Sequence, residues 1–241
     1  MIYKLPSLTI FFPFYNDADT VERVISSAYK YGQIVANKLE VIAIHGGSSY
    51  DDTWSKILEV KKKFSTLRVI NKSDNTEGYG VIKYGFQAAK NEWVFYTDGD
   101  GQYEMRDLLK LMSKQQQTNA DLVNGYKTAR HDAWQRQFFG NVFQKLHQLL
   151  IHAPIRDIHC DFRLLRTKYV QHIQWETQRA TIISELILKI EKQGAIFAEQ
   201  PVKHREREYG HSSYNVYQLL LESAQEILWS LKYKYVTASK Y

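Results

Sequence analysis

Apolar residues in the first part of the chain follow two patterns that alternate with each other. Short continuous apolar runs predict buried strands, and apolar residues spaced three or four apart predict helices with one buried face. The predicted strands are Leu8–Phe14, Leu39–Ile44, Leu67–Ile70 and Trp93–Tyr96, and the predicted helices begin near Val21 and Trp54 or span about Val81–Ala89. Because strands that alternate with helices pair in parallel through right-handed crossovers, this pattern predicts an α/β fold.

The second part of the chain has a less regular pattern. It predicts strands at Asp121–Asn124, Phe162–Leu165 and Ala195–Val202, and helices at Trp134–Ile151, Ile182–Glu191 and Val216–Lys232. We expect one domain of residues 1–215, followed by an amphipathic helix and tail of residues 216–241. Ligands of such sheets bind at the carboxyl ends of the strands, so loops 13–17, 45–52 and 98–102 should converge on one site.

Composition narrows the class of protein. The chain has 241 residues, of which 44% are hydrophobic, and this is enough apolar mass for a packed core. Its single cysteine, Cys160, excludes an intrachain disulfide and favours a cytoplasmic protein. No stretch reaches the roughly 18 to 20 apolar residues of a transmembrane helix, so we expect any membrane contact to be peripheral, at the inner face. The formal net charge of +6 indicates an anionic partner or a solvated basic surface.

An acidic motif, Asp98-Gly99-Asp100-Gly101-Gln102, directly follows the fourth predicted strand. Two carboxylates two residues apart in a loop can turn toward one hard cation, and Mg²⁺ or Mn²⁺ leaves coordination positions for substrate phosphates. The amide oxygen of Gln102 is a further candidate ligand. The alternative is an ordinary surface turn, since Asp and Gly both favour turns. The position at the end of an apolar strand favours the metal site.

Other ligand-binding motifs do not fit the spacing of the residues. A calcium loop of the EF-hand kind that began at Asp98 would need Gly and Glu where the chain has Tyr103 and Leu109. The glycines between Gly78 and Gly85 do not match the dinucleotide fingerprint, and the chain has no phosphate loop of the G-x-x-x-x-G-K-[ST] kind. The acidic motif is therefore the main chemical signal.

Five motifs are distributed over nearly the whole chain. They are PFYND (Pro13–Asp17), the segment Asn75–Gln102, NGYKTARHDAWQRQFFGNVFQ (Asn124–Gln144), DIHCDFRLLR (Asp157–Arg166) and REYGHSS (Arg207–Ser213). From about Leu8 to Tyr214 this order resembles the inverting family 2 glycosyltransferases, in particular the dolichyl-phosphate mannose synthase and polyprenyl-phosphate glycosyltransferase branch. The resemblance implies a Rossmann-like GT-A fold, a three-layer αβα sandwich with a mostly parallel central sheet. About residues 1–102 would bind the nucleotide sugar and about residues 103–215 the acceptor.

The resemblance also implies ligands and the residues that bind them. The donor would be a GDP- or UDP-linked sugar, bound by Pro13, Tyr15, Asp17, Ile44, His45, Gly78, Asp98, Gly99, Asp100, Arg207 and His211. Asp98, Asp100 and Gln102 would hold Mg²⁺ or Mn²⁺. Where the family usually has Asp-Asp-Gly-Ser, this chain has His45-Gly46-Gly47-Ser48, so that carboxylate is missing. His45 is either a nucleotide ligand or a structural residue at a strand end.

The implied reaction is an inverting displacement, in which negative charge builds on the departing nucleoside diphosphate. A cation on Asp98 and Asp100, together with Arg207, would stabilise that charge. Polyprenyl phosphate, the preferred acceptor by resemblance, is largely dianionic at pH 7 and needs cations instead of a base. The candidate cations are Lys127, Arg130, Arg136 and Arg163. A glycan hydroxyl would need a carboxylate base, Asp161 or Glu185, and for all these residues a structural ion pair is the alternative role.

The end of the chain suggests further partners. The last helix carries Tyr217, Trp229, Tyr233 and Tyr235 beside Lys232 and Lys234, which is typical of a helix at a lipid interface. The alternative is packing on the domain or on the second subunit of a homodimer. We exclude nucleic acid as a partner of Lys203–His211, because Glu206 and Glu208 would repel phosphates. The competing function is a catalytically silent nucleotide-sugar binder or scaffold.

Overall fold

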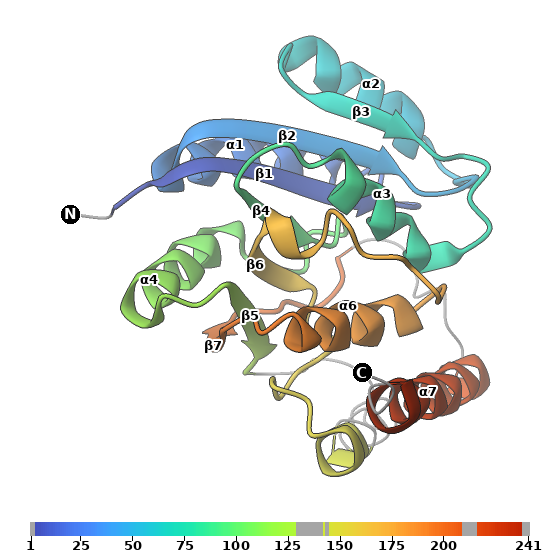
Figure 1. Cartoon of the computed structure of the whole chain (residues 1–241). Helices are drawn as coiled ribbons and strands as arrows, with labels where there is room; N and C mark the ends of the chain where they lie inside the picture. The colour runs from blue at the N-terminus through green and yellow to red at the C-terminus, as the bar shows by residue number, and fades with distance from the viewer. Residues whose placement is uncertain (1–2, 129–141, 143–144, 209–215, 238–241) are drawn as a thin grey trace.

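The chain forms one seven-stranded sheet covered by helices (Figure 1). The computed structural model describes residues 3–128, 142, 145–208 and 216–237. The strands are β1 (Leu5–Phe14), β2 (Ala36–His45), β3 (Arg68–Asn71), β4 (Trp93–Thr97), β5 (Leu122–Lys127), β6 (Phe162–Arg166) and β7 (Phe197–Val202). The α-helices are α1 (Val21–Val35), α2 (Thr53–Lys63), α3 (Ile82–Ala88), α4 (Leu108–Thr118), α6 (Thr181–Lys192) and α7 (Val216–Leu231), and residues 145–151 are also helical. Short 3-10 helices lie at η1 (Gly78–Val81), η2 (Met105–Asp107) and η3 (Thr167–Tyr169), and a π-helical segment, η4, spans Lys232–Thr237.

The strand order is β3-β2-β1-β4-β6-β5-β7. The pairs of β1 with β2 and β4, of β2 with β3 and of β5 with β7 are parallel. Strand β6 lies antiparallel between β4 and β5, with Trp93 opposite Arg166 and Leu122 opposite Leu165. The predicted α/β fold with a mostly parallel central sheet is therefore confirmed, and the direction of β6 is what the sequence did not reveal.

Strand β1 shows why the centre of the sheet is apolar on both faces. Its side chains alternate in direction, so Ile10 and Phe12 pack under α1, α2 and α4, whereas Phe11 packs with α3 and α6 on the opposite face. All three side chains are fully buried. A central parallel strand buried on both faces reads as a continuous apolar run, which is the pattern that predicted this strand. The two helix layers and the sheet form the expected three-layer sandwich.

The predicted elements of the N-terminal part all occur, with ends that differ by a few residues. Helix α4 was not predicted. Its buried face is formed by Leu108, Leu111, Met112 and Gln115, and a glutamine at one of these positions weakens the apolar pattern. The predicted helix Trp134–Ile151 falls largely outside the described residues, and its last turns are helical at 145–151.

The C-terminal helix exists as predicted, but it buries polar residues. Glu226 and Ser230 of α7 are almost fully buried, whereas Leu228 is 67% exposed. Glu226 accepts a short hydrogen bond from Ser184 of α6, and a ring nitrogen of His159 lies 3.2 Å from the same carboxylate. These polar contacts hold α7 against the domain. Among the helices in the described ranges, none combines the length and apolar character that a membrane crossing requires.

Candidate active site

Three loops meet at the carboxyl ends of β1, β2 and β4, as the sequence predicted. The amide of Gly99 donates to the carbonyl of Pro13 at 3.2 Å, and the amide of Gly46 donates to the carbonyl of Phe14 at 2.9 Å. The hydroxyl of Thr20 donates to the carbonyl of Gly99 at 2.6 Å. Loops 13–17, 45–52 and 98–102 are therefore joined by hydrogen bonds, and their side chains share one site.

Gly99 allows the acidic loop to lie directly against β1. A Cβ atom at this position would lie 2.3 Å from Cδ1 of Phe14 and 2.6 Å from the carbonyl oxygen of Pro13. Both distances are too short for any side chain, so only glycine fits. This close approach fixes the backbone between Asp98 and Asp100.

Asp98 lies at the centre of a group of acids. Its Oδ1 accepts a hydrogen bond from the hydroxyl of Tyr79 at 2.8 Å. Burial, followed by the negative charges of Asp161 and Asp100, raises the pKa of Asp98 well above its ordinary value, and Lys127 acts in the opposite direction. A buried carboxylate whose ionisation is opposed by two neighbouring acids marks a site that a cation would stabilise.

Asp100 is held from two sides. Its Oδ1 accepts from the amide of Gln102 at 3.0 Å, and its Oδ2 accepts from Nη2 of Arg207 at 2.7 Å. The side-chain amide of Gln102 donates to the carbonyl of Arg205 at 2.9 Å, and the amide of Arg205 donates back to the carbonyl of Gln102 at 2.8 Å. Gln102, predicted as a metal ligand, thus ties the acidic loop to the segment that carries Arg207.

Asp161 reaches the same edge from the other half of the sheet. It precedes β6, and because β6 is antiparallel its beginning lies beside the end of β4. The hydroxyl of Tyr96 donates to Oδ1 of Asp161 at 3.1 Å, and the amide of Asp161 donates to the hydroxyl of Tyr103 at 3.1 Å. The carboxylate is 14% exposed, so it is oriented and still open to the site.

Arg163 does not lie where an acceptor could bind it. Its side chain is fully buried and donates to Oδ1 of Asn124, to the hydroxyl of Tyr96 and to the carbonyl of Ile158. Its Nη2 also lies 3.8 Å from Asp161. Of the two roles predicted for Arg163, acceptor ligand and structural ion pair, these contacts favour the structural one: Arg163 is an internal cation that holds Tyr96 and lies near the carboxylate of Asp161.

Lys127, a predicted acceptor ligand, lies at the carboxyl end of β5. Its Nζ donates to the carbonyl of His159 at 3.0 Å and lies 5.9 Å from the centre of the Tyr103 ring. The side chain is half-buried next to the acids. Arg130, Arg136 and His211, also predicted as ligands, lie outside the described residues.

His45 has a structural position. Its Nδ1 is 3.1 Å from Oδ1 of Asn71, its Nε2 is 3.0 Å from the hydroxyl of Ser49, and its ring stacks on Trp54. The residue is 5% exposed, so both ring nitrogens are used inside the protein. Of the two roles left open, these contacts favour the structural one. Ile44, another predicted contact, is fully buried in the core.

The first-strand motif places two polar residues at the entrance. The amide of Tyr15 donates to Oδ2 of Asp17 at 2.9 Å, and the Tyr15 ring lies edge-on to Tyr50. Burial, and to a smaller extent the charge of Asp100, raises the pKa of Asp17 to about 7 despite that hydrogen bond. Gly78 has a φ of +55°, a left-handed conformation that favours glycine and turns the chain into η1 beside Tyr79.

Glu185 cannot act as the alternative base. It is fully buried in α6 and accepts hydrogen bonds from the amides of Glu176 and Thr177 at 2.7 and 2.8 Å. Lys189, one turn later, lies 2.7 Å from the same carboxylate. Glu185 therefore holds the segment before α6, and Asp161 is the remaining candidate.

The carboxylate oxygens at this edge of the sheet suit a hard divalent cation. In the described ranges no three His, Cys, Asp or Glu side chains form a closed metal site. Asp98 and Asp100 offer carboxylate oxygens that can each accept more than one partner. A cation held by two carboxylates keeps positions for phosphate oxygens and water, which is how Mg²⁺ binds in phosphate-transfer sites. The residues fit Mg²⁺ or Mn²⁺ on these grounds.

Sequence reasoning missed three tyrosines of the site. The hydroxyls of Tyr79, Tyr96 and Tyr103 contact Asp98 or Asp161, yet Tyr96 belongs to an apolar strand and resembles a core aromatic residue. A signal existed only for Tyr79, which lies between two glycines just before a helix. A buried tyrosine usually finds a partner for its hydroxyl, but the sequence does not say which one.

Comparisons with known proteins agree with this geometry. The family model of glycosyl transferase family 2 matches residues 9–174. An uncharacterized protein of Methanocaldococcus jannaschii is 25% identical over 228 residues, which cover 90% of this chain and 95% of that protein.

Solved structures with the same fold include glucosyl-3-phosphoglycerate synthase of Mycobacterium tuberculosis. Its complex with Mn²⁺, UDP and glucosyl-3-phosphoglycerate has a TM-score of 0.69 at 16% identity, covering 95% of this chain and 80% of that one. Its complex with Mg²⁺ and UDP has a TM-score of 0.68 at 15% identity, covering 95% and 79%. These likenesses confirm the expected GT-A sandwich. With the family model matching more than half of its length, the chain belongs to glycosyl transferase family 2.

Proposed function

We propose that this chain transfers a sugar from a GDP- or UDP-linked donor to polyprenyl phosphate, with inversion at the anomeric carbon and with Mg²⁺ or Mn²⁺ as cofactor. The observation that carries the proposal is the convergence of Asp98, Asp100, Asp161 and Arg207 at one edge of the sheet. A catalytically silent binder or scaffold would not need Arg207 paired with Asp100. Nor would it need a further acid, Asp161, near Asp98. The complexes of the synthase from M. tuberculosis with UDP and Mn²⁺ or Mg²⁺ support the donor and the metal by analogy.

The donor side of the reaction is assigned to the acidic loop and Arg207. Asp98 and Asp100 would hold the cation, which when bound supplies positive charge against the departing diphosphate. Arg207 now donates to Asp100 at 2.7 Å, and its side chain is 30% exposed. It can therefore exchange part of this ion pair for a phosphate oxygen. Gln102 keeps Arg207 close by pairing with Arg205.

The acceptor side is assigned to Lys127 and Asp161. A phosphate acceptor needs a cation to approach three carboxylates, and Lys127 is half-buried at their border. Because a phosphate dianion is already a nucleophile, this acceptor would need no proton removed by Asp161. The second candidate acceptor is a hydroxyl group. Hydrogen bonds with Tyr96 and Tyr103 fix the position of Asp161, as a general base requires, and this favours a hydroxyl acceptor.

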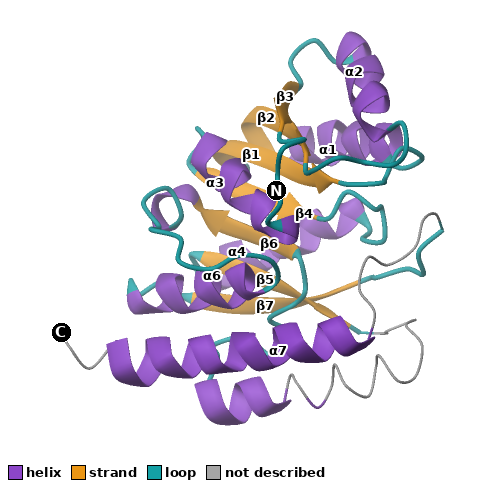
Figure 2. Cartoon of the chain, turned by 90° about the vertical axis from the view of Figure 1, so that its right-hand side faces the viewer, coloured by secondary structure: helices purple, strands orange, loops and turns teal. Residues whose placement is uncertain are grey.

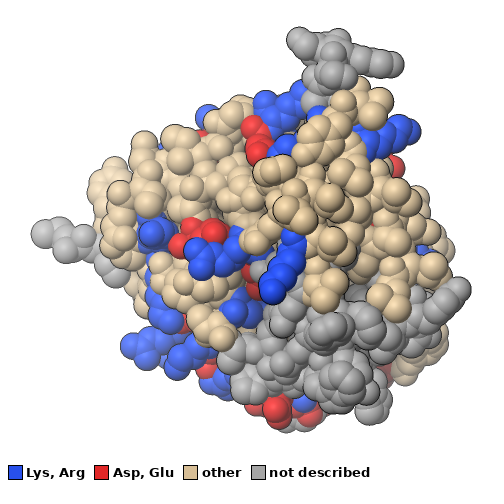
Figure 3. Space-filling model, turned by 90° about the horizontal axis from the view of Figure 1, so that it is seen from below, with Lys and Arg blue, Asp and Glu red and all other residues tan. Residues whose placement is uncertain are grey.

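A lipid acceptor also fits an apolar surface near the end of the chain. Helix 145–151 and α7 lie side by side in Figure 2, and Tyr235 of η4, which follows α7, donates its hydroxyl hydrogen to the carbonyl of Leu150 at 2.8 Å. Leu149 and Leu228 are 71% and 67% exposed on these helices. Lys234 donates to the carbonyl of His152, directly after helix 145–151, at 3.2 Å and lies 3.3 Å from Glu191. A peripheral membrane contact combines such exposed apolar side chains with basic ones. Seen from below, basic and acidic side chains of the described residues are interspersed on the surface (Figure 3).

The proposal is tested by a donor and acceptor screen. The purified protein is incubated with GDP- and UDP-sugars, with and without polyprenyl phosphate, in the presence of Mn²⁺ or Mg²⁺. We expect lipid-linked product with one donor, its loss on chelation, and its loss in Asp100→Ala. The matched control is Asp74→Ala, which removes an exposed carboxylate elsewhere. Wild-type activity in Asp100→Ala would refute the metal assignment, and failure to bind any nucleotide diphosphate would favour the scaffold.

A further inference from the structure

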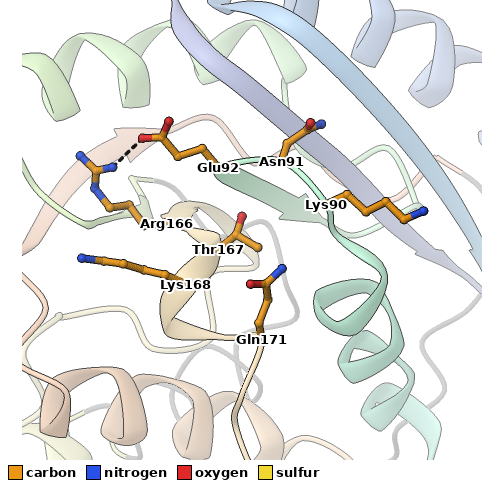
Figure 4. Close-up of a pocket in the computed structure, with 7 residues that line it drawn as sticks. All are labelled: Lys90, Asn91, Glu92, Arg166, Thr167, Lys168 and Gln171. Atoms are coloured by element: carbon orange, nitrogen blue, oxygen red, sulfur yellow. Dashed lines mark hydrogen bonds and ion pairs between the residues drawn. The ribbon is translucent and has the colours of Figure 1, made fainter.

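The two ends of β6 are held in different ways. At the end of the strand, Arg166 lies 2.7 Å from Glu92, beside a cavity of about 270 Å³ (Figure 4). The side chains of Lys90 and Lys168, which also line this cavity, point to opposite sides in Figure 4, so their charges do not meet at one ligand. The beginning of β6, in contrast, directly follows the segment 157–161, which reaches the active site.

The segment 157–161 holds Lys127 from two sides. The carbonyl of His159 accepts from Nζ of Lys127 at 3.0 Å, and the carboxylate of Asp157 accepts from the backbone amide of the same lysine at 3.1 Å. The last residue of the segment is Asp161, the candidate acid of the acceptor side. The position of this segment therefore sets the positions of both residues that are assigned to the acceptor.

The side chain of His159 links the segment 157–161 to α7. Its Nε2 lies 3.2 Å from Oε1 of Glu226. Because an ionised carboxylate can only accept hydrogen bonds, this contact is favourable when the ring nitrogen carries a proton. The backbone of His159 thus contacts Lys127 while its ring contacts the helix, and one residue joins α7 to the acceptor side.

Glu226 is itself fixed inside the protein. It is 1% exposed, and its Oε1 also accepts a short hydrogen bond from the hydroxyl of Ser184 in α6. Nε2 of His147, in helix 145–151, lies 3.6 Å from the same oxygen. A buried carboxylate is costly unless it is paired with such groups. The place of this carboxylate therefore depends on how α7 packs against the domain.

We propose that Glu226 is a positioning residue for the acceptor: through His159 it sets the place of Lys127 and Asp161, so that the packing of α7 controls acceptor binding without affecting the donor. This inference rests on the proposed transfer to an acceptor at Lys127. An ammonium group has three donors, so Lys127 can bind a phosphate oxygen and still keep its bond to the carbonyl of His159. Misplacement of a binding group by about 1 Å can cost on the order of 10²-fold in rate, so a small shift of this segment would be measurable.

Glu226→Gln tests the inference, since it removes the charge and nearly keeps the size of the side chain. We expect the KM for a short-chain polyprenyl phosphate to rise about tenfold, while the KM for the nucleotide sugar stays unchanged. His159→Gln removes the other partner and should have the same effect. The double variant should add little to either single change, because both act on one contact. No rise in the acceptor KM, or an equal rise for both substrates, would overturn the inference.

Ser184→Ala is the matched control, because it removes a different hydrogen bond of the same carboxylate. It should lower the melting temperature of the protein and leave the acceptor KM unchanged. If the acceptor KM rose in both Ser184→Ala and Glu226→Gln in proportion to the loss of melting temperature, Glu226 would only stabilise the fold and the inference would be wrong.

Two-dimensional NMR of the isotope-labelled protein without substrates gives a readout that does not depend on sugar transfer. The amide signals of Lys127 and Asp161 should shift in Glu226→Gln and keep their positions in Ser184→Ala. If the wild type transferred sugar to no acceptor, the proposed function would fail, and these signals would still decide the positioning role. Unshifted signals in Glu226→Gln would overturn that role.

Discussion

The two halves of the sheet bring acidic residues to the active site in different ways. In the parallel half, Asp98 and Asp100 follow the carboxyl end of β4, where the ligands of such sheets normally bind. In the other half, Asp161 precedes the amino end of β6 and reaches the same edge because β6 runs antiparallel. The direction of a strand thus decides which of its two ends places residues at the active-site edge of the sheet. If the halves divide the chemistry as proposed, changes in the first should affect the donor and changes in the second the acceptor.

The largest effect in this comparison is expected at Arg207. Replacing Arg207 by Ala removes the cation that faces the diphosphate, and we expect kcat to fall about 10²–10³-fold, as for other charge-stabilising donors. Steady-state kinetics with saturating donor measure it. The control Arg106→Ala removes an exposed arginine of η2 and should leave kcat unchanged. A normal kcat with a raised KM for the acceptor would instead place Arg207 on the acceptor side.

A smaller effect is expected at Tyr79, which orients Asp98 through its hydroxyl. Tyr79→Phe removes the 2.8 Å hydrogen bond and should weaken Mn²⁺ binding about tenfold, as is typical for partners of metal ligands. Titration with Mn²⁺ in the presence of nucleotide diphosphate measures the affinity. Tyr84→Phe is the matched control, since that ring contacts Lys72 without a role in the site. Equal metal affinity in both variants would contradict the role of Tyr79.

Asp161→Asn distinguishes the two candidate acceptors. With polyprenyl phosphate, which needs no base, we expect turnover to stay within about tenfold of the wild type while donor binding is unchanged. With a hydroxyl acceptor, loss of the base would lower turnover about 10²–10⁴-fold. Single-turnover assays with each acceptor class separate these results. A loss of 10² or more with polyprenyl phosphate would mean that Asp161 takes part in the displacement itself.

The smallest effect is a pH dependence of stability that arises from Asp17. Its pKa is raised to about 7 in the folded protein, so the folded state holds a proton between about pH 4 and 7 that the unfolded chain releases. This contribution to stability is present below pH 4 and is lost as the pH rises through 7. Asp17→Asn should therefore gain stability relative to the wild type between pH 5 and 8, by on the order of 1 kcal/mol. Urea unfolding of both proteins at pH 5 and pH 8, without ligands, measures their free energies of unfolding. An equal difference between variant and wild type at the two pH values would contradict the raised pKa of Asp17.

The donor side was largely predictable from local sequence. The acidic loop follows the WVFYT run, and such runs predict buried parallel strands whose ends are ligand sites. Gly99 is part of the same predicted loop, but its close contact with Phe14 is visible only in the folded structure. The role of Gln102 was less predictable, because an amide side chain bonds equally well to a metal or to a backbone carbonyl.

The acceptor side was less predictable. Arg163 was predicted as an acceptor ligand or a member of a structural ion pair, and arginines are seldom fully buried unless they are paired. It is buried because Asn124, Tyr96 and the carbonyl of Ile158 together satisfy its guanidinium. The burial of Glu185 has the same cause, because backbone amides before α6 donate hydrogen bonds to its carboxylate. No local pattern reveals such partners, because they come from distant parts of the chain.

Local sequence patterns account for the alternation of strands and helices, for the parallel half of the sheet and for the position of the acidic loop. These follow from apolar periodicity and turn chemistry, which act over a few neighbouring residues. The antiparallel direction of β6 and the position of Asp161 near Asp98 come from the tertiary fold instead. These depend on pairing between residues far apart in the chain, and each such pairing is selected by the packing of the whole domain.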